Sequence, residues 1–181
     1  MPVYISMLRG INVSGQKTIK MVDLKALYES IGFSDVTTYI QSGNVVFKSK
    51  KENPAAVGAE VVKSIEKKFG FMVTVIMRQP SELATVIKKN PFIGRLGVDE
   101  SRLHVTFLQA KPTPALVKAL VPLTAQSKDE YQAIGSEIYL HCFTGYGKTL
   151  LSNTFFEKQL KVAATTRNWN TVNALYSMAT N

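Results

Sequence analysis

The chain has 181 residues, enough for one domain or two small ones with a sizeable core. Apolar residues make up 45% and charged residues 19%, which is typical of a soluble globular protein, and no apolar run approaches the roughly 18 residues of a membrane span. Met1–Arg9 lacks the basic region that opens a signal peptide, and the single cysteine, Cys142, excludes an internal disulfide. We therefore expect a cytoplasmic protein without a membrane segment.

The net charge is +9, from 22 basic and 13 acidic residues. Such a balance favours a nucleic acid or another anionic partner. The charge is spread evenly, because residues 1–77 carry ten basic and six acidic groups while residues 78–181 carry twelve and seven. The one tight basic cluster, Lys48, Lys50 and Lys51, follows a predicted strand and is interpreted as a solvated loop. Charge alone therefore selects no partner.

The first part of the chain alternates short apolar runs with helical spacing. In chain order, the patterns predict a strand at 3–8, a loop at 10–20, a helix at 21–31, strands at 36–40 and 45–48, a helix at 55–69 and a strand at 71–77. Gly32 and Gly70 end the two helices, and Gln41–Asn44 forms a hairpin turn. The order β-α-β-β-α-β is that of the ferredoxin-like unit.

The remainder nearly repeats this order. The patterns predict a helix at 82–89 capped by Ser81, a loop at 91–101, a strand at 103–109, a helix at 113–120, strands at 130–134 and 137–143, a helix up to 160 and a last helix at 168–179. Thr154 and Glu157 fit a capping box for the helix that ends at 160. Residues 103–160 thus read β-α-β-β-α. We expect an α+β protein of two tandem ferredoxin-like subdomains.

The predicted subdomains are residues 1–78 and residues 79–181. Each has an antiparallel sheet with helices packed on one face. Helix 82–89 links the two subdomains, and helix 168–179 closes the chain.

Three segments together resemble the family known as domain of unknown function 1697. They are Leu8-Arg9-Gly10-Ile11-Asn12-Val13, Tyr39-Ile40-Gln41-Ser42-Gly43-Asn44-Val45-Val46-Phe47 and Ala164-Thr165-Thr166-Arg167-Asn168-Trp169-Asn170-Thr171. The resemblance implies two ferredoxin-like subdomains and brings no established activity or catalytic residue. Two positions depart from the family pattern: Ser14 stands where glycine is common, and Leu150 stands where a lysine often follows the Gly-rich turn.

That Gly-rich turn, Gly145-Tyr146-Gly147-Lys148-Thr149, is similar to the end of a phosphate-binding loop. A P-loop needs a glycine five residues before Gly147, where Cys142 stands. Two interpretations stay open: a smaller anion nest that includes Lys148, or a flexible turn with one surface lysine.

Arg9 and Asn12 follow the first strand, where an arginine is suited to bidentate recognition of phosphate or carboxylate. Arg9 could equally pair with a carboxylate such as Glu157. In the hairpin turn, Gln41 and Ser42 are more polar than the turn itself requires.

The sequence has few patterns that are typical of catalytic or metal-binding sites. His104 and His141 have no third metal ligand at useful spacing, so we predict no metal and no cofactor. Neighbouring residues of a strand point to opposite faces, which argues against a nucleophile pair of Cys142 and His141. We expect Cys142 in the core and His141 at the surface. Acid–base catalysis by Asp or Glu stays open.

In the closing segment, Trp169 begins an apolar stripe at helical spacing and is interpreted as a core anchor. Thr166 or Asn168 suits the N-cap of the last helix. Arg167 has no evident structural duty there. A cation beside a helix N-terminus is unfavourable unless an anion lies between them, which makes Arg167 the best functional hint in the sequence.

We hypothesise that polar residues at strand ends, turns and a helix start converge on one cleft between the subdomains and bind a nucleotide or phosphorylated small molecule. The candidate ligand residues are Arg9, Asn12, Gln41, Ser42, Lys148, Arg167 and Asn168. A single-stranded nucleic acid stacked on Tyr39 and Phe47 is an alternative. An enzyme with Glu157 as general base and a protein-interaction module are further alternatives. The sequence leaves catalysis and oligomeric state open.

Overall fold

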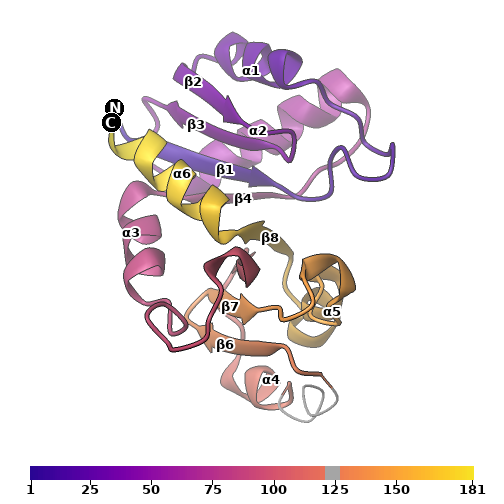
Figure 1. Cartoon of the computed structure of the whole chain (residues 1–181). Helices are drawn as coiled ribbons and strands as arrows, with labels where there is room; N and C mark the ends of the chain where they lie inside the picture. Colours follow the sequence, from indigo (N-terminus) through magenta and orange to yellow (C-terminus); the bar gives the residue numbers. More distant parts are fainter. Residues whose placement is uncertain (121–126) are drawn as a thin grey trace. The chain divides into compact units, whose positions relative to one another are not determined.

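The computed structural model describes residues 1–120 and 127–181 of the chain (Figure 1). They form two compact units: unit 1 comprises Met1–Ala84 and Ala174–Asn181, and unit 2 comprises Thr85–Asn173. The unit boundaries fall inside two helices, α3 (Pro80–Lys88) and α6 (Trp169–Thr180). The predicted division at residues 78 and 79 stays a prediction of domain boundaries.

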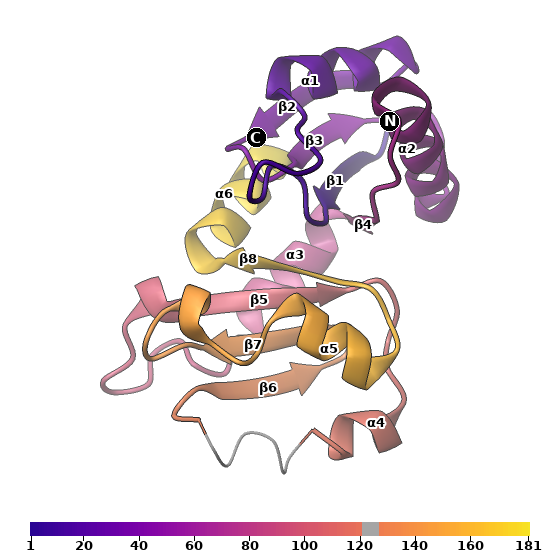
Figure 2. The same ribbon diagram turned by 90° about the vertical axis from the view of Figure 1, so that its right-hand side faces the viewer.

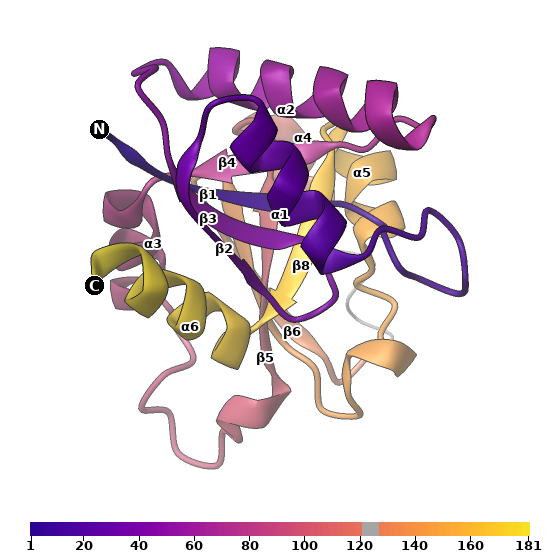
Figure 3. The same cartoon turned by 90° about the horizontal axis from the view of Figure 1, so that it is seen from above.

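Unit 1 has the predicted β-α-β-β-α-β order. Its elements are β1 (Val3–Leu8), α1 (Met21–Ser30), β2 (Ser34–Tyr39), β3 (Asn44–Lys48), α2 (Pro54–Phe69) and β4 (Val75–Arg78). The strands form one antiparallel sheet in the order β2-β3-β1-β4, the ferredoxin-like arrangement. Both helices lie over the same face of this sheet (Figure 3).

The core of unit 1 fills the space between that face and the two helices. Leu24, Leu27 and Tyr28 of α1 meet Val57, Val61 and Ile65 of α2 there, over Tyr4, Val45 and Phe47 of the sheet. Phe47 is fully buried, and its ring stacks on Phe33 with centroids 4.6 Å apart. An aromatic platform for nucleic-acid bases therefore cannot include Phe47.

The strand before α3 begins later than predicted. Gly70, at φ 81°, ends α2 as expected, but β4 starts only at Val75. Phe71 lies before this strand and packs on Phe69 of α2, with ring centroids 6.3 Å apart. The apolar run at residues 71–77 therefore contains a residue that packs on α2 and the beginning of a short strand.

Gly43 brings the hairpin turn against the end of β1. Its φ is 77°, and a Cβ on this residue would lie 2.7 Å from both Leu8 Cβ and Ile11 Cδ1. The Leu8 amide also donates to the Gly43 carbonyl over 2.9 Å. Only glycine satisfies both the backbone conformation and the close approach.

Unit 2 repeats the order completely. Its elements are β5 (Leu103–Leu108), α4 (Pro114–Lys118), β6 (Glu130–Ile134), β7 (Glu137–His141), α5 (Asn153–Leu160) and β8 (Ala164–Asn168). The antiparallel sheet order β6-β7-β5-β8 matches that of unit 1. Figure 2 shows α5 over one face of this sheet. The predicted fold of two ferredoxin-like halves with a closing helix is confirmed.

Strand β8 was missed by the sequence interpretation, which placed residues 164–168 ahead of a helix and in no strand. These residues pair with β5, with Thr166 opposite Thr106 and Ala164 opposite Leu108. The strand is polar, yet Thr165 is only 1% exposed. A buried strand of this kind carries no apolar alternation that a sequence pattern could detect.

The helix before β8 also begins differently. Ser152, not Thr154, is the N-cap of α5, and its hydroxyl accepts from the Phe155 amide over 3.2 Å. Glu157 does not complete a capping box with Thr154; its carboxylate accepts from the Ala164 amide over 3.0 Å. This bond ties the last turn of α5 to the first residue of β8.

Candidate anion-binding site

Four of the seven predicted ligand residues belong to unit 1, and the structure joins two of them. Asn12 donates from Nδ2 to the carbonyls of Gln41 and Ile19 over 2.8 and 2.9 Å, and its Oδ1 accepts from the Ile19 amide over 2.8 Å. Asn12 thus closes the loop after β1 and fastens it to the hairpin turn. Its carboxamide has a clear structural role.

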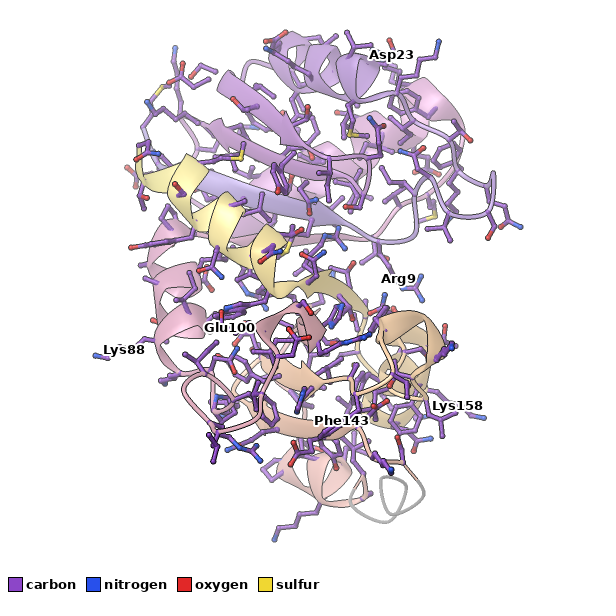
Figure 4. All side chains as sticks on the ribbon, in the orientation of Figure 1. Arg9, Asp23, Lys88, Glu100, Phe143 and Lys158 are labelled. Carbon is purple, nitrogen blue, oxygen red and sulfur yellow. The ribbon has the colours of Figure 1, made fainter. Side chains whose placement is uncertain are left out.

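The other two residues of this set flank the same junction. Arg9 follows β1, and its amide donates to the Thr74 carbonyl over 2.9 Å. Its side chain extends from the end of the strand (Figure 4). The Ser42 hydroxyl accepts from Asn44 Nδ2 over 3.0 Å inside the turn. The Gln41 side chain is exposed.

Arg167 is the central charged group of the predicted set in unit 2. It lies on β8, two residues before α6 begins, and is only 7% exposed. Its Nη1 donates to Thr165 Oγ1 over 2.7 Å and to the Thr166 carbonyl over 2.9 Å. Burial lowers the pKa of Arg167 to about 10, while the nearby Tyr146 acts in the opposite direction. The guanidinium stays charged at neutral pH.

Asn168 starts the last helix, as one of the two predicted N-caps. Its Oδ1 accepts from the Thr171 amide over 2.8 Å. Trp169, at 5% exposure, is buried as expected for a core anchor. The sequence therefore located the start of α6 within one residue, although the strand that leads into it went undetected.

The Gly-rich turn is organised by a carboxylate. Asp129, only 6% exposed, accepts from the Phe143 amide over 2.9 Å and from the Thr149 hydroxyl over 2.5 Å. Within the turn, the amides of Lys148 and Thr149 donate to the carbonyls of Gly145 and Tyr146. These hydrogen bonds hold the backbone of the turn, and Lys148 is exposed at its end. The two interpretations, an anion nest that includes Lys148 and a flexible turn with one surface lysine, stay predictions.

His141 is buried, which contradicts the prediction of a surface histidine. It is 3% exposed, because its strand ends beneath aromatic rings: the Phe92 and Phe143 centroids lie 5.8 and 4.2 Å away. Its Nδ1 lies 3.2 Å from Glu130 Oε2, and Arg95 Nη2 donates to Glu130 Oε1 over 3.2 Å. The result is a short row of bonded polar side chains, Arg95, Glu130 and His141, at the β6–β7 edge.

Cys142 is fully buried, as predicted. Burial, helped by the charge of Asp129, raises the pKa of its thiol to about 11, so it is not an activated nucleophile. In the part of the chain that the structure describes, no group of three or more His, Cys, Asp or Glu is placed to hold a metal ion. Of the described helices, none is long and apolar enough to cross a membrane.

A polar row on the α5 face of the unit 2 sheet was not predicted. The Thr166 hydroxyl donates to Asn153 Oδ1 over 2.6 Å and lies 2.8 Å from the Thr106 hydroxyl. His104 lies two residues before Thr106 on β5, and its ring stacks on Tyr146 with centroids 5.0 Å apart. The only available signal was the alternation of polar residues at His104 and Thr106, which is too short to define a site.

These features define the class of protein: an α+β chain of two ferredoxin-like halves with a buried arginine before its last helix. The chain belongs to the DUF1697 family, described as a protein of unknown function, which matches residues 1–139. Two of the three segments that carry the resemblance lie within these residues. The third, Ala164–Thr171, lies beyond them.

The chain is also similar to a solved structure, that of the conserved bacterial protein SP0830 from Streptococcus pneumoniae. The TM-score is 0.68 at 20% sequence identity, and the match covers 98% of each chain. At this identity the likeness shows the fold and no more. No curated protein matches the chain in sequence.

Proposed function

We propose that the protein binds an anionic small molecule, a nucleotide or a phosphorylated metabolite, through Arg167. The observation that carries the proposal is the placement of a buried guanidinium two residues before a 12-residue helix. The N-terminus of α6 bears a partial positive charge, so an anion placed between it and Arg167 would be stabilised by both groups. Such an anion also gains charge-assisted hydrogen bonds from the guanidinium.

The contacts of Arg167 support this proposal. Thr165 Oγ1 and the Thr166 carbonyl hold one end of the guanidinium, which fixes the direction of its planar face and edge. A guanidinium held in this way loses little side-chain entropy when a ligand binds. Its depressed pKa shows that burial disfavours the charged form, and an added anion would offset that cost.

A panel of inorganic phosphate, pyrophosphate, nucleotides and sugar phosphates in a thermal-shift titration tests the proposal. A ligand at a hundred times its Kd stabilises the native state by about 2.7 kcal/mol, which is a shift of several degrees. We expect Arg167→Gln to abolish the shift and Arg167→Lys, which keeps the charge and loses the fork, to weaken it. Lys158→Gln, an exposed change on α5, is the matched control.

The outcomes separate cleanly. A panel without any shift, or a shift that survives Arg167→Gln in a folded variant, contradicts the proposal. Arg9→Ala in the same titration tests the prediction that Arg9 serves the same ligand. Oligonucleotide binding that falls steeply with salt, without any small-molecule shift, would favour the nucleic-acid alternative.

A further inference from the structure

The loop between β1 and α1 has an unusual backbone. From Gly10 to Lys17, five of eight residues have positive φ, and three of the five are not glycine: Asn12 at 55°, Ser14 at 51° and Lys17 at 46°. Each such residue costs about 1 kcal/mol relative to an ordinary conformation. Ser14 thus holds a conformation that glycine adopts more readily.

Specific bonds hold the loop in this shape. The Asn12 carboxamide makes its three hydrogen bonds at the base of the loop. Lys17 Nζ donates to the Met72 carbonyl over 2.8 Å, and the Asn12 amide donates to the Lys17 carbonyl over 3.3 Å. The loop is thus attached to the segment between α2 and β4, although residues 13–18 are all exposed.

The surface so formed combines apolar and basic side chains. We call it the loop surface and define it by Val13, Lys17, Lys20, Lys68 and Met72. Val13 and Met72 are 58% and 64% exposed. Lys68 Nζ donates to the Asp23 carbonyl over 3.3 Å, which places it at the start of α1. The chain has no acidic residue before Asp23, so positive charge dominates the loop.

Figures 3 and 4 show where the loop lies. The loop projects from unit 1 beside the start of α1 (Figure 3), and Asp23 marks the first turn of that helix (Figure 4). A loop held by the hydrogen bonds of Asn12 and Lys17 pays less ordering cost than an untethered one when a partner binds.

We propose that the loop surface is a preformed docking site for an acidic polypeptide segment that carries apolar side chains. Carboxylates of the segment pair with Lys17, Lys20 and Lys68, and its apolar side chains cover Val13 and Met72. The two exposed apolar side chains of the surface, Val13 and Met72, are aliphatic and offer no ring on which a base could stack. The loop tip Ser14-Gly15-Gln16 is polar, and a peptide backbone can bond to it whereas lipid chains cannot.

A labelled synthetic peptide of alternating Glu and Leu is the probe, used with the full chain in fluorescence anisotropy. Two reference peptides replace Glu with Gln or Leu with Ser. We expect saturable binding of the Glu–Leu peptide and about tenfold weaker binding of each reference, because each lacks one half of the interaction. Equal binding of the Gln–Leu peptide, or no saturable binding of the Glu–Leu peptide, overturns the proposal.

Paired variants locate the binding. Val13→Ser with Met72→Ser, and Lys20→Gln with Lys68→Gln, should each weaken the Glu–Leu peptide about tenfold. Leu150→Ser and Lys158→Gln in unit 2 remove an equally exposed apolar residue and a lysine, and they should change the affinity less than about twofold. An affinity for the Glu–Leu peptide that is unchanged in the Val13→Ser, Met72→Ser variant contradicts the proposal.

Two other ligands test whether the surface binds nucleic acid or membrane instead of a polypeptide. Oligo-dT and phosphatidylserine vesicles should bind more weakly than the Glu–Leu peptide at equal ionic strength. Tighter binding of either one, lost in the Val13→Ser, Met72→Ser variant, assigns the surface to nucleic acid or to membrane and refutes a polypeptide partner. Each result is independent of Arg167, so the proposal stands or falls apart from the small-molecule function.

Discussion

Asn12 Nδ2 donates to the backbone carbonyl of Gln41 over 2.8 Å, across 29 positions of sequence. Both residues were candidate ligand groups. Their direct bond shows that polarity at a strand end and a turn serves first to join the two. The prediction that either contacts a ligand stays a prediction.

Asn12→Ala should therefore destabilise the protein. It removes three hydrogen bonds and leaves the amide and carbonyl of Ile19, a residue with 2% exposure, without this partner. We expect a loss of about 1–3 kcal/mol in the free energy of unfolding, measured by urea denaturation. Gln16→Ala, an exposed change in the same loop, is the control and should be nearly neutral. Equal stability of the two variants would contradict the role given to Asn12.

Gly43→Ala and Gly10→Ala separate backbone strain from crowding. Both glycines have positive φ, 77° and 68°, but only at Gly43 would a Cβ meet neighbouring atoms, at 2.7 Å. We expect about 1 kcal/mol for Gly10→Ala and about 2–4 kcal/mol for Gly43→Ala in urea denaturation. Similar losses for the two would mean that the turn and the end of β1 can move apart.

The polar row of unit 2 has a fixed direction of donation. Thr166 has one hydroxyl hydrogen and gives it to Asn153 Oδ1, which can only accept, so the Thr106 hydroxyl must donate to Thr166. Thr166→Val removes both bonds, whereas Thr106→Val removes one. We expect Thr166→Val to cost about 1 kcal/mol more than Thr106→Val in thermal or urea unfolding. The reverse order would show that the row is arranged differently.

Glu130 should contribute a pH-dependent part of the stability. Burial acts to raise the pKa of its carboxyl, but hydrogen bonds from His141 and Arg95 outweigh this and lower it from 4.5. The folded pKa lies below the unfolded one. The contribution of the Glu130 carboxylate to the free energy of unfolding is therefore complete above about pH 4.5. It is lost as the pH falls through the lower pKa of the folded state.

The measurement is the urea midpoint of wild type and Glu130→Gln between neutral and acidic pH. Because Glu130 is 40% exposed, the difference should be below about 1 kcal/mol and should shrink toward low pH. Glu100→Gln changes another carboxylate of unit 2, labelled in Figure 4, and is the control. A Glu130→Gln difference that does not change with pH would contradict the pairing with His141 and Arg95.

The sequence predicted most of the fold because apolar spacing and glycine positions agree with it. Gly70 ends α2, and the turn at Gln41–Asn44 joins β2 to β3. Strand β8 escaped because its buried threonines are satisfied by hydrogen bonds, and a pattern of hydrophobicity does not register them. His141 was misplaced for a related reason: its burial depends on Phe92, distant in sequence.

The candidate site was predictable only as a set of residue types. Polarity beyond local need selected Asn12 and Arg167, yet Asn12 proved to hold a loop and Arg167 to lie on a strand. Without knowledge of tertiary contacts, a sequence does not distinguish a side chain that bonds to the backbone from one that is available to bind a ligand. The sequence predicted a loop at residues 10–20 between β1 and α1, but not the positive φ of Asn12, Ser14 and Lys17.

Strand β2 is an edge strand of its sheet, next to β3. Its pairing slips between Ser34 and Thr37, and Asp35 sits there with φ 51° and an ion pair to Lys48 at 2.7 Å. A straight outer strand would present a continuous row of amides and carbonyls to a neighbouring molecule. The interruption breaks that row, so this edge of the sheet is a poor template for chain-to-chain pairing.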